Sequence, residues 1–265
     1  MKKTILKMLL KKLNSEPQFD EQSNQKVMEL KKRDISKNYE HNLDTFKTLF
    51  SYPKNTDVKV REFRVRALDR RAFIIYISTM VDVQNIQEGI IEKLLKSDQP
   101  TRNIEDIVSY PILKSAPIIG EITEYITGGI TALFIDGDQD CYLFETTKTR
   151  GRGIETSQNE VIVKGAKEAF NEKVIDNIAL IRKKIKNENL IIESQVVSKR
   201  SRNDVFLVYQ KDLVNEDLLK NIKEKLAGLD TDKILDLSIL EQYLEERPRS
   251  LFPTLLYTER PDRAA

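Results

Sequence analysis

Two stretches of the chain predict the same order of secondary-structure elements, and this repeat narrows the possible folds more than any other feature. Each stretch contains a strand, which alternates apolar and charged residues in the first stretch, then a charged turn, a continuous apolar strand and a helix preceded by an Asp or Asn cap. The stretches are residues 58–94 and 190–226, and Phe73 and Phe206 stand at the same place in them, 133 residues apart. A repeat of this length predicts two related α/β subdomains rather than a solenoid.

The residues around the first stretch predict further helices and strands. They are a helix at 40–50 ended by Pro53, a short helix after Asn103, a helix at 119–127 ended by Gly128, and a hairpin of strands 130–135 and 142–144. Residues 146–160 are polar and contain two Gly, which favours a hinge between the two halves.

The second half predicts two more helices. The first is long, from about 167 to 186, and its apolar stripe is Phe170, Val174, Ile178, Ile181 and Ile185. The last begins at a capping box of Ser238 and Glu241 and ends before Pro248.

The sequence therefore divides into four predicted regions. They are a basic amphipathic N-terminus with a polar linker (1–36), a first α/β subdomain (37–150), a second α/β subdomain (151–252) and a tail (253–265). The expected fold class is α/β, with two related strand–turn–strand–helix units. Residues 1–13 alternate Lys with Ile and Leu, and either lie on an anionic membrane or form a frayed or docked terminal helix.

The counts of reactive side chains exclude several kinds of site. With one His and one Cys, the chain cannot supply a four-ligand Cys/His zinc site, a three-His zinc site or an internal disulfide. His41 and Cys141 lie in no nucleophile motif, so we expect a surface His and a core Cys. No pair of carboxylates stands out for acid–base chemistry. We therefore expect no enzyme, no metal and no cofactor.

Charged segments predict solvated surfaces. Asp136–Asp140 lacks the Gly and Glu that a calcium-binding EF-hand loop requires, so an acidic hairpin turn is expected. Thr147–Gly153 lacks the P-loop spacing and favours a flexible linker, with a phosphate contact as the alternative. The basic stretches 59–71 and 182–202 contain interspersed acids, and the net charge is only +2, so no nucleic-acid partner is expected.

The apolar runs of the chain are short. A membrane-spanning helix needs about 20 consecutive apolar residues, and runs such as 73–77 and 130–135 fall far below that length. The N-terminus lacks the long apolar core and cleavage site of a secretory signal. As it stands, the sequence predicts a soluble intracellular polypeptide.

Three segments of the second half carry a family likeness. They are Asn159–Phe170 (NEVIVKGAKEAF), Asn177–Ile185 (NIALIRKKI) and Tyr257–Arg263 (YTERPDR). They resemble the GerA-type spore germination proteins, the A subunits of nutrient germinant receptors in spore-forming bacteria. The likeness covers about residues 60–265 and is strongest from 151 onward. Ala166 and Ala169 stand where the family often has Pro and Gly, and both changes favour helix.

The resemblance implies an environment and partners for the chain. Such an A subunit has a two-part α/β N-terminal domain, reminiscent of bilobed solute-binding proteins, which faces the cytosol or spore core from the spore inner membrane. The implied partners are the B and C subunits of the same receptor and other A subunits, and nutrients such as amino acids or sugars are sensed by the assembled receptor. Since the family continues past its Pro-Asp-Arg motif, residues 253–265 are expected to lead into a membrane region beyond this sequence.

We therefore expect a non-catalytic domain that contributes to receptor assembly and to the nutrient signal that triggers germination. The tail supplies candidate coupling residues, because its Pro restrict the backbone and its charges can form interfacial ion pairs. They are Pro253, Glu259, Arg260, Pro261, Asp262 and Arg263. Two alternatives stay open: the tail is merely a structural exit linker, or the domain binds the germinant itself in a cleft between the lobes.

Overall fold

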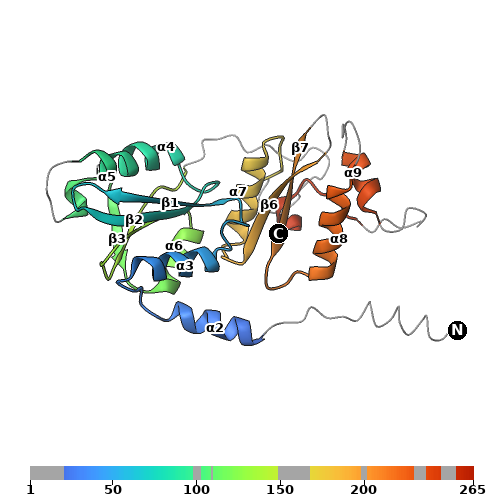
Figure 1. The fold of residues 1–265 in the computed structure, drawn as a ribbon. Helices are drawn as coiled ribbons and strands as arrows, with labels where there is room; N and C mark the ends of the chain where they lie inside the picture. The colour runs from blue at the N-terminus through green and yellow to red at the C-terminus, as the bar shows by residue number, and fades with distance from the viewer. Residues whose placement is uncertain are drawn as a thin grey trace.

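Two α/β units, each with its own antiparallel sheet, lie side by side in the computed structural model (Figure 1). The structure describes residues 21–97, 103–108, 110–148, 168–197, 202–229, 237–245 and 255–265. We refer to the described residues up to 148 as the first unit and to those from 168 as the second unit. The mixed α/β class is as predicted. The bilobed likeness to solute-binding proteins and the domain boundaries stay predictions, and those on residues 1–13 and 149–160 lie outside the described residues.

The sheet of the first unit contains the predicted strands and one more. Its strands are β1 (Val58–Val65), β2 (Arg70–Ile77), β3 (Ile112–Ala116), β4 (Thr131–Ile135) and β5 (Cys141–Phe144), in the spatial order β1-β2-β4-β5-β3. Each strand is antiparallel to its neighbours. The central strand β2 is a continuous apolar run because Phe73 and Ile75 face one hydrophobic core while Ile74 and Tyr76 face another.

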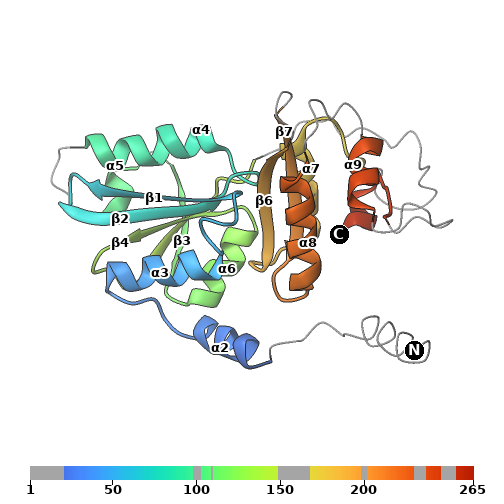
Figure 2. The ribbon, with the colours of Figure 1, turned by 45° about the vertical axis from the view of Figure 1, so that its right-hand side comes forward.

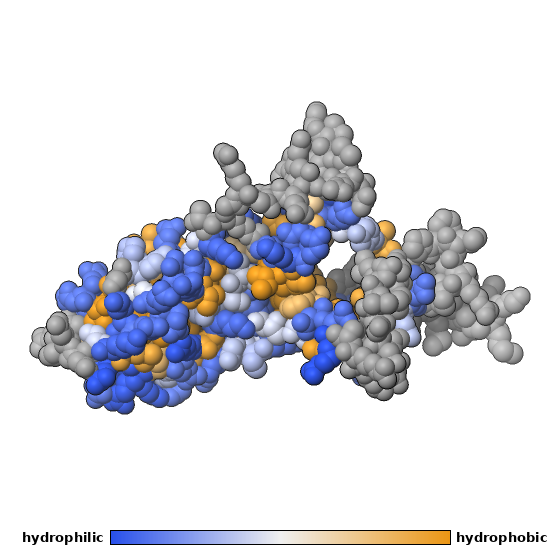
Figure 3. Space-filling view, turned by 90° about the horizontal axis from the view of Figure 1, so that it is seen from above, coloured by the Kyte–Doolittle hydropathy of each residue, from blue (hydrophilic) through white to orange (hydrophobic). Residues whose placement is uncertain are grey.

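Helices cover both faces of this sheet (Figures 1 and 2). One face carries α3 (Tyr39–Leu49) and α6 (Ile119–Thr127), which confirms both predicted helices. The other carries α4 (Val83–Ile86), the π-helical turn η1 (Gln87–Ile91), α5 (Glu92–Lys96) and the 3-10 turn η2 (Ile104–Asp106). As predicted, the Asp82 carboxylate caps α4 by accepting from the backbone N–H of Gln84 and Asn85. From above, hydrophilic residues predominate over this unit, with hydrophobic ones between them (Figure 3).

The N-terminal segment differs from its prediction. Within the polar linker expected up to residue 36, residues 21–31 form helix α2 (Glu21–Lys31). Two of its three apolar side chains, Val27 and Leu30, pack against the core of the first unit, while the third, Met28, is exposed. The helix lies so close to α6 that a Cβ at Gly120 would be 2.8 Å from the Lys31 carbonyl oxygen. A polar sequence therefore folds here because two apolar contacts and one close backbone approach fix it.

The second unit is built around a hairpin. Its elements are α7 (Val174–Lys184), β6 (Leu190–Val197), β7 (Asn203–Gln210), α8 (Glu216–Ala227), α9 (Leu237–Leu244) and α10 (Pro261–Ala264). β6 pairs antiparallel with β7, and within the described ranges this sheet has two strands. A small core of Val197, Leu226 and Leu229 joins the sheet to α8 and α9. Strand 206–209, predicted as buried, is half-exposed, because its sheet is covered less completely than that of the first unit.

Helix α7 is shorter than predicted, and its buried face is different. The prediction started it near 167, but residues 168–173 are not helical and α7 begins at Val174. Val174 and Ile175 are 38% and 61% exposed, so the predicted stripe fails in the first turn. The fully buried side chains further along include Arg182, at 1% exposure. Apolar periodicity therefore predicted the buried face of α7 incorrectly, because that face includes a charged residue, Arg182.

The repeat is confirmed in the structure and begins one helix earlier than predicted. Val58 pairs with Ile77 as Leu190 pairs with Gln210, and Asn215 caps α8 as Asp82 caps α4. The helices before the hairpins also match. The side chain of Asn42 in α3 forms two hydrogen bonds with the backbone of Ser36: its Oδ1 accepts from the N–H at 2.8 Å, and its Nδ2 donates to the carbonyl at 2.5 Å. Asn177 of α7 forms the same two hydrogen bonds with Asn171, at 2.9 and 2.6 Å.

Candidate functional site

The junction between the two units is the candidate functional site, and it is built by one loop. Residues 50–57 connect α3 to β1 in the first unit, whereas the matching connection in the second unit, residues 185–189, is three residues shorter. The longer loop reaches the edge of β6. Thr56 donates its backbone N–H to the Ile192 carbonyl at 2.8 Å, and the Asn55 side chain donates to the Leu190 carbonyl at 3.0 Å and accepts from the Ile192 N–H at 3.2 Å.

A buried ion pair lies beneath this loop. The Nε of Arg182 donates to Oδ2 of Asp57 at 3.1 Å, and both side chains are 1% exposed. Burial lowers the pKa of the Arg182 guanidinium, while the charge and hydrogen bond of Asp57 raise it. A guanidinium has so high a pKa that it stays protonated under these opposing effects. The pair therefore places two full charges inside the junction.

The remaining hydrogen-bonding capacity of this pair is also used. Asp57 accepts from the Thr79 N–H at 3.0 Å, from the Thr79 hydroxyl at 2.9 Å and from the Ser78 hydroxyl at 3.1 Å. Arg182 donates to the Asn187 carbonyl at 3.3 Å. Removing one member of such a pair leaves the other charged and buried, which costs about 3–5 kcal/mol. A relative movement of the two units that separated Arg182 from Asp57 would have to break these contacts.

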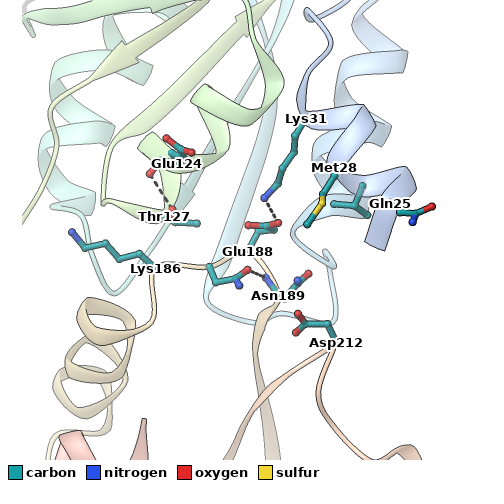
Figure 4. A pocket seen from close by; sticks show the side chains of 11 residues that line it. Gln25, Met28, Lys31, Glu124, Thr127, Lys186, Glu188, Asn189 and Asp212 are labelled. Carbon is teal, nitrogen blue, oxygen red and sulfur yellow. Dashed lines mark hydrogen bonds and ion pairs between the residues drawn. The ribbon is translucent and has the colours of Figure 1, made fainter. Parts of the chain in front are cut away.

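A cavity of about 670 Å³ opens beside the junction, between α2, α6 and the second unit (Figure 4). Its lining residues come from α2, from α6, from the α7–β6 loop and from the turn after β7; they are Gln25, Val27, Met28, Lys31, Glu124, Thr127, Lys186, Asn187, Glu188, Asn189 and Asp212. Across the cavity wall Lys31 of α2 forms an ion pair with Glu188 of the second unit. The cavity thus brings together polar groups of the two units, those of the first unit coming from α2 and α6.

The predicted tail residues lie against the same helix that supplies Arg182. The carbonyl of Glu259 accepts from the Phe170 N–H at 2.8 Å, and Pro261 is buried at the start of α10, which packs on α7. Arg260 and Asp262 form an ion pair with each other at 2.5 Å, and Arg263 is exposed. Pro253 lies outside the described residues. Glu259, Arg260, Pro261 and Asp262 are consecutive residues at the start of α10, and α10 packs on α7.

The other residues singled out from the sequence have structural surroundings. His41 is exposed and Cys141 is fully buried, as expected, and burial raises the pKa of the Cys141 thiol. In the predicted acidic turn, Asp138 forms an ion pair with Arg70 at 2.6 Å. Of Thr147–Gly153, the last five residues lie outside the described part. Among the residues that the structure describes, no three His, Cys, Asp or Glu side chains are grouped to hold a metal ion.

The junction residues Asn55, Asp57 and Arg182 were missed by sequence reasoning. Arg182 was read as part of a basic surface stretch, because a single cation in a helix gives no sign of burial. The connection between helix and strand is three residues longer in the first repeat than in the second, but this difference appears only with the helix ends that the structure gives. Within the described ranges, no helix has the length and apolarity needed to cross a membrane.

Comparison with known proteins places the chain in a family. The model of the Bacillus/Clostridium GerA spore germination proteins matches residues 44–265. Spore germination protein KA of Bacillus subtilis is 30% identical over 218 residues, which are 80% of this chain and 40% of that protein. Spore germination protein B1 of the same organism is 27% identical, over 86% of this chain and 48% of that protein. The chain thus spans less than half the length of these relatives.

A solved structure agrees with this assignment. The N-terminal domain of the A subunit of the Bacillus megaterium spore germinant receptor GerK3 superposes with a TM-score of 0.62 and 26% sequence identity, and 87% of each chain is covered. The family match extends over most of the chain, and the structural match includes both units. This chain belongs to the GerA family of spore germination proteins.

Proposed function

We propose that this chain is the N-terminal domain of a spore germinant receptor A subunit, and that it contributes to receptor assembly and to transduction of the nutrient signal. The observation that carries the proposal is the structural likeness to such a domain over 87% of both chains. The proposed partners are the B and C subunits and other A subunits, with nutrient sensing by the assembled receptor. We propose a place at the spore inner membrane, with the domain on the cytosolic or core side, and no catalytic role.

Helix α7 offers a physical route for the signal. Its Arg182 is held by Asp57 of the first unit, while the tail packs on α7 through α10 and contacts the segment before α7 through the hydrogen bond of Glu259 with Phe170. A displacement of the first unit is therefore passed to α7 as a whole, and from α7 to the tail. Thr146, the first residue of the hinge predicted at 146–160, is buried, and its hydroxyl forms a hydrogen bond with that of Thr131 at 2.6 Å.

Charge reversal in the tail tests this relay. In the full-length receptor, Glu259→Lys and Arg260→Glu would remove the Arg260–Asp262 pair and alter the charges beside α7. We expect slower nutrient-triggered germination at unchanged receptor abundance. Reversal of the exposed Glu216 in the second unit, as Glu216→Lys, serves as the matched control. Normal germination of the tail variants at normal abundance would leave the tail as a structural linker and sink the relay.

The cavity favours a second candidate function, direct ligand binding by this domain. Its volume of about 670 Å³ lies within the range of small-molecule sites, and its walls carry charged and amide groups from both units. Calorimetry of the domain with amino acids and sugars tests this candidate. A saturable heat supports it, and the absence of heat with every germinant counts against it while leaving the assembly role intact.

A further inference from the structure

In each unit, the residue before the first hairpin strand meets the residues after the second strand, and one carboxylate lies at this corner. The carboxylate belongs to the first of these positions in one unit and to the second in the other. Asp57 and Asn189 directly precede the first strands, and their carbonyls accept from the backbone N–H of Ser78 and Lys211 at 2.9 and 2.8 Å. Thr79 and Asp212 follow the second strands by two residues. Asp57 of the first unit therefore corresponds to Asn189 in the second, and Thr79 corresponds to Asp212.

In the first unit this corner is fully bonded, and it includes a cation. Thr79 and Ser78 donate to the Asp57 carboxylate, and Arg182 completes it with a charged N–H. The residue of α3 at the position of Arg182 is Lys47, which pairs with Glu62 on the surface at 2.8 Å. Of these two equivalent residues, Arg182 therefore reaches the Asp57 corner of the first unit, whereas Lys47 does not reach the Asp212 corner of the second.

In the second unit the corner carboxylate is left incomplete. Oδ1 of Asp212 is withdrawn from solvent and has no hydrogen-bond partner among the described residues. A buried acceptor without a donor costs about 1–3 kcal/mol. Asp212 as a residue is half-exposed, so rotation about its Cα–Cβ bond can present this oxygen to a donor that enters from the cavity.

The charges of the cavity favour a positive ligand. Its lining carries three carboxylates, Glu124, Glu188 and Asp212, against two ammonium groups, Lys31 and Lys186. Lys31 is already bound by Glu188, and Lys186 is exposed. Figure 4 shows Asp212 and Asn189 next to each other at one end of the cavity. That end is therefore where a cation gains most.

We propose that the cavity binds a small organic cation, an alkylammonium or alkylguanidinium compound, whose N–H groups donate to Asp212 as Arg182 donates to Asp57. The inference rests on the second candidate function, ligand binding in this cavity, and gives the chemical class of the ligand. It does not depend on the assembly role. A ligand at this place touches α2, α6 and the second unit together, so its binding stabilises their present arrangement.

The test uses probes that share a shape and differ in charge. Butylguanidinium and butylammonium are titrated into the isotope-labelled chain and followed by NMR, with 1-butanol as the neutral counterpart and butyrate as the anion. We expect saturable shifts of the backbone amides of Asn189 and Asp212 with the two cations only. Asp212→Asn, which keeps the side-chain shape, should weaken binding about 10- to 100-fold. Asp204→Asn, a change of the same kind at an exposed site of β7, should leave it unaltered.

Each of the other possible results would refute a defined part of the proposal. Equal affinity of the Asp212→Asn variant, or equal binding of butanol, would refute the cation site but keep direct ligand binding. Binding of a blocked peptide with a central Arg, without binding of the alkyl cations, would show that the site serves a protein side chain and refute the small-molecule inference. No saturable shift with any probe would refute the inference, and germinant calorimetry would then decide the second candidate function separately.

Discussion

Phe73 and Phe206 stand at the same position of β2 and β7, yet Phe73 is completely buried and Phe206 is half-exposed. β2 pairs with β1 on one edge and with β4 on the other, and its two faces lie against two hydrophobic cores. β7 belongs to a sheet with two strands in the described ranges and to one small core. The same sequence pattern thus yields a well-packed strand in one unit and a half-covered strand in the other.

This difference shows why the junction is polar and specific. A two-stranded sheet is marginally stable alone, so the second unit gains from an additional partner. The loop 50–57 supplies that partner: Asn55 and Thr56 bind the edge of β6, and Asp57 neutralises Arg182. The larger unit therefore supports the smaller one through hydrogen bonds and ion pairs, of which Asp57–Arg182 is the buried one.

The largest expected effect separates the two cores directly. Phe73→Ala removes a ring that stacks on Phe134 with centroids 4.5 Å apart, and should lower the free energy of unfolding by about 3–5 kcal/mol. Phe206→Ala removes the same group from a half-exposed site and should lower it by about 1–2 kcal/mol. Denaturant titration followed by circular dichroism measures both. Equal losses would contradict the inequality of the two cores.

The next effect concerns the dependence of the second unit on the first. Arg182→Met leaves Asp57 charged and buried, and should lower the free energy of unfolding by about 3 kcal/mol, since three other donors still bind the carboxylate. Lys47→Met at the equivalent position breaks an exposed pair and should change it by less than about 1 kcal/mol. Thermal unfolding of both variants gives the comparison.

A double variant serves as the control for this pair. Asp57→Leu combined with Arg182→Met removes both charges, and apolar replacement of a buried pair is often neutral or stabilising. Recovery of most of the lost stability would show that the uncompensated charge, and not lost packing, caused the effect. A double variant as unstable as Arg182→Met would contradict that account.

The same comparison explains which features the sequence could predict. The strands other than β3, the Asp82 and Asn215 caps and the repeat depend on local patterns, and they are confirmed. The predicted start of α7 was wrong. Asn177 forms two hydrogen bonds with the backbone of Asn171, so the helix begins only after that residue, and apolar periodicity does not include such a contact. The Asp57–Arg182 pair joins residues 125 positions apart, and no local pattern predicts which cation is buried.

A smaller effect is expected from loss of the Asn side-chain hydrogen bonds at the start of each repeat. Asn42→Ala removes two hydrogen bonds from a nearly buried site and should lower the free energy of unfolding by about 2 kcal/mol. Asn177→Ala removes the same two bonds from a half-buried site, where water replaces them in part, and should cost about 1 kcal/mol. Hydrogen exchange of the Ser36 and Asn171 amides measures the local loss. A faster exchange at Asn171 alone would contradict this order.

The smallest expected effect is a difference in acid sensitivity between two carboxylates, one in each unit. Burial alone raises the pKa of Glu193, but hydrogen bonds from Lys223 and Tyr209 and the nearby Lys charges outweigh it, so the pKa is lowered. The hydrogen bond from Lys47 is the main cause that lowers the pKa of Glu62. A carboxyl whose pKa is lower in the folded state stabilises the fold above its unfolded pKa, and this contribution is lost as the pH falls through the folded value.

Replacing each carboxylate with an amide separates the two contributions. Between about pH 6 and about pH 3, Glu193→Gln should reduce the loss of unfolding free energy more than Glu62→Gln does. The reason is exposure: the Glu193 side chain is 17% exposed, whereas that of Glu62 is 48% exposed and its pairing is weakened by water and salt. Denaturant titrations at both pH values, in low and high salt, measure the difference. A larger effect at Glu62 would mean that the first unit, despite its better core, depends more on surface charge than the second.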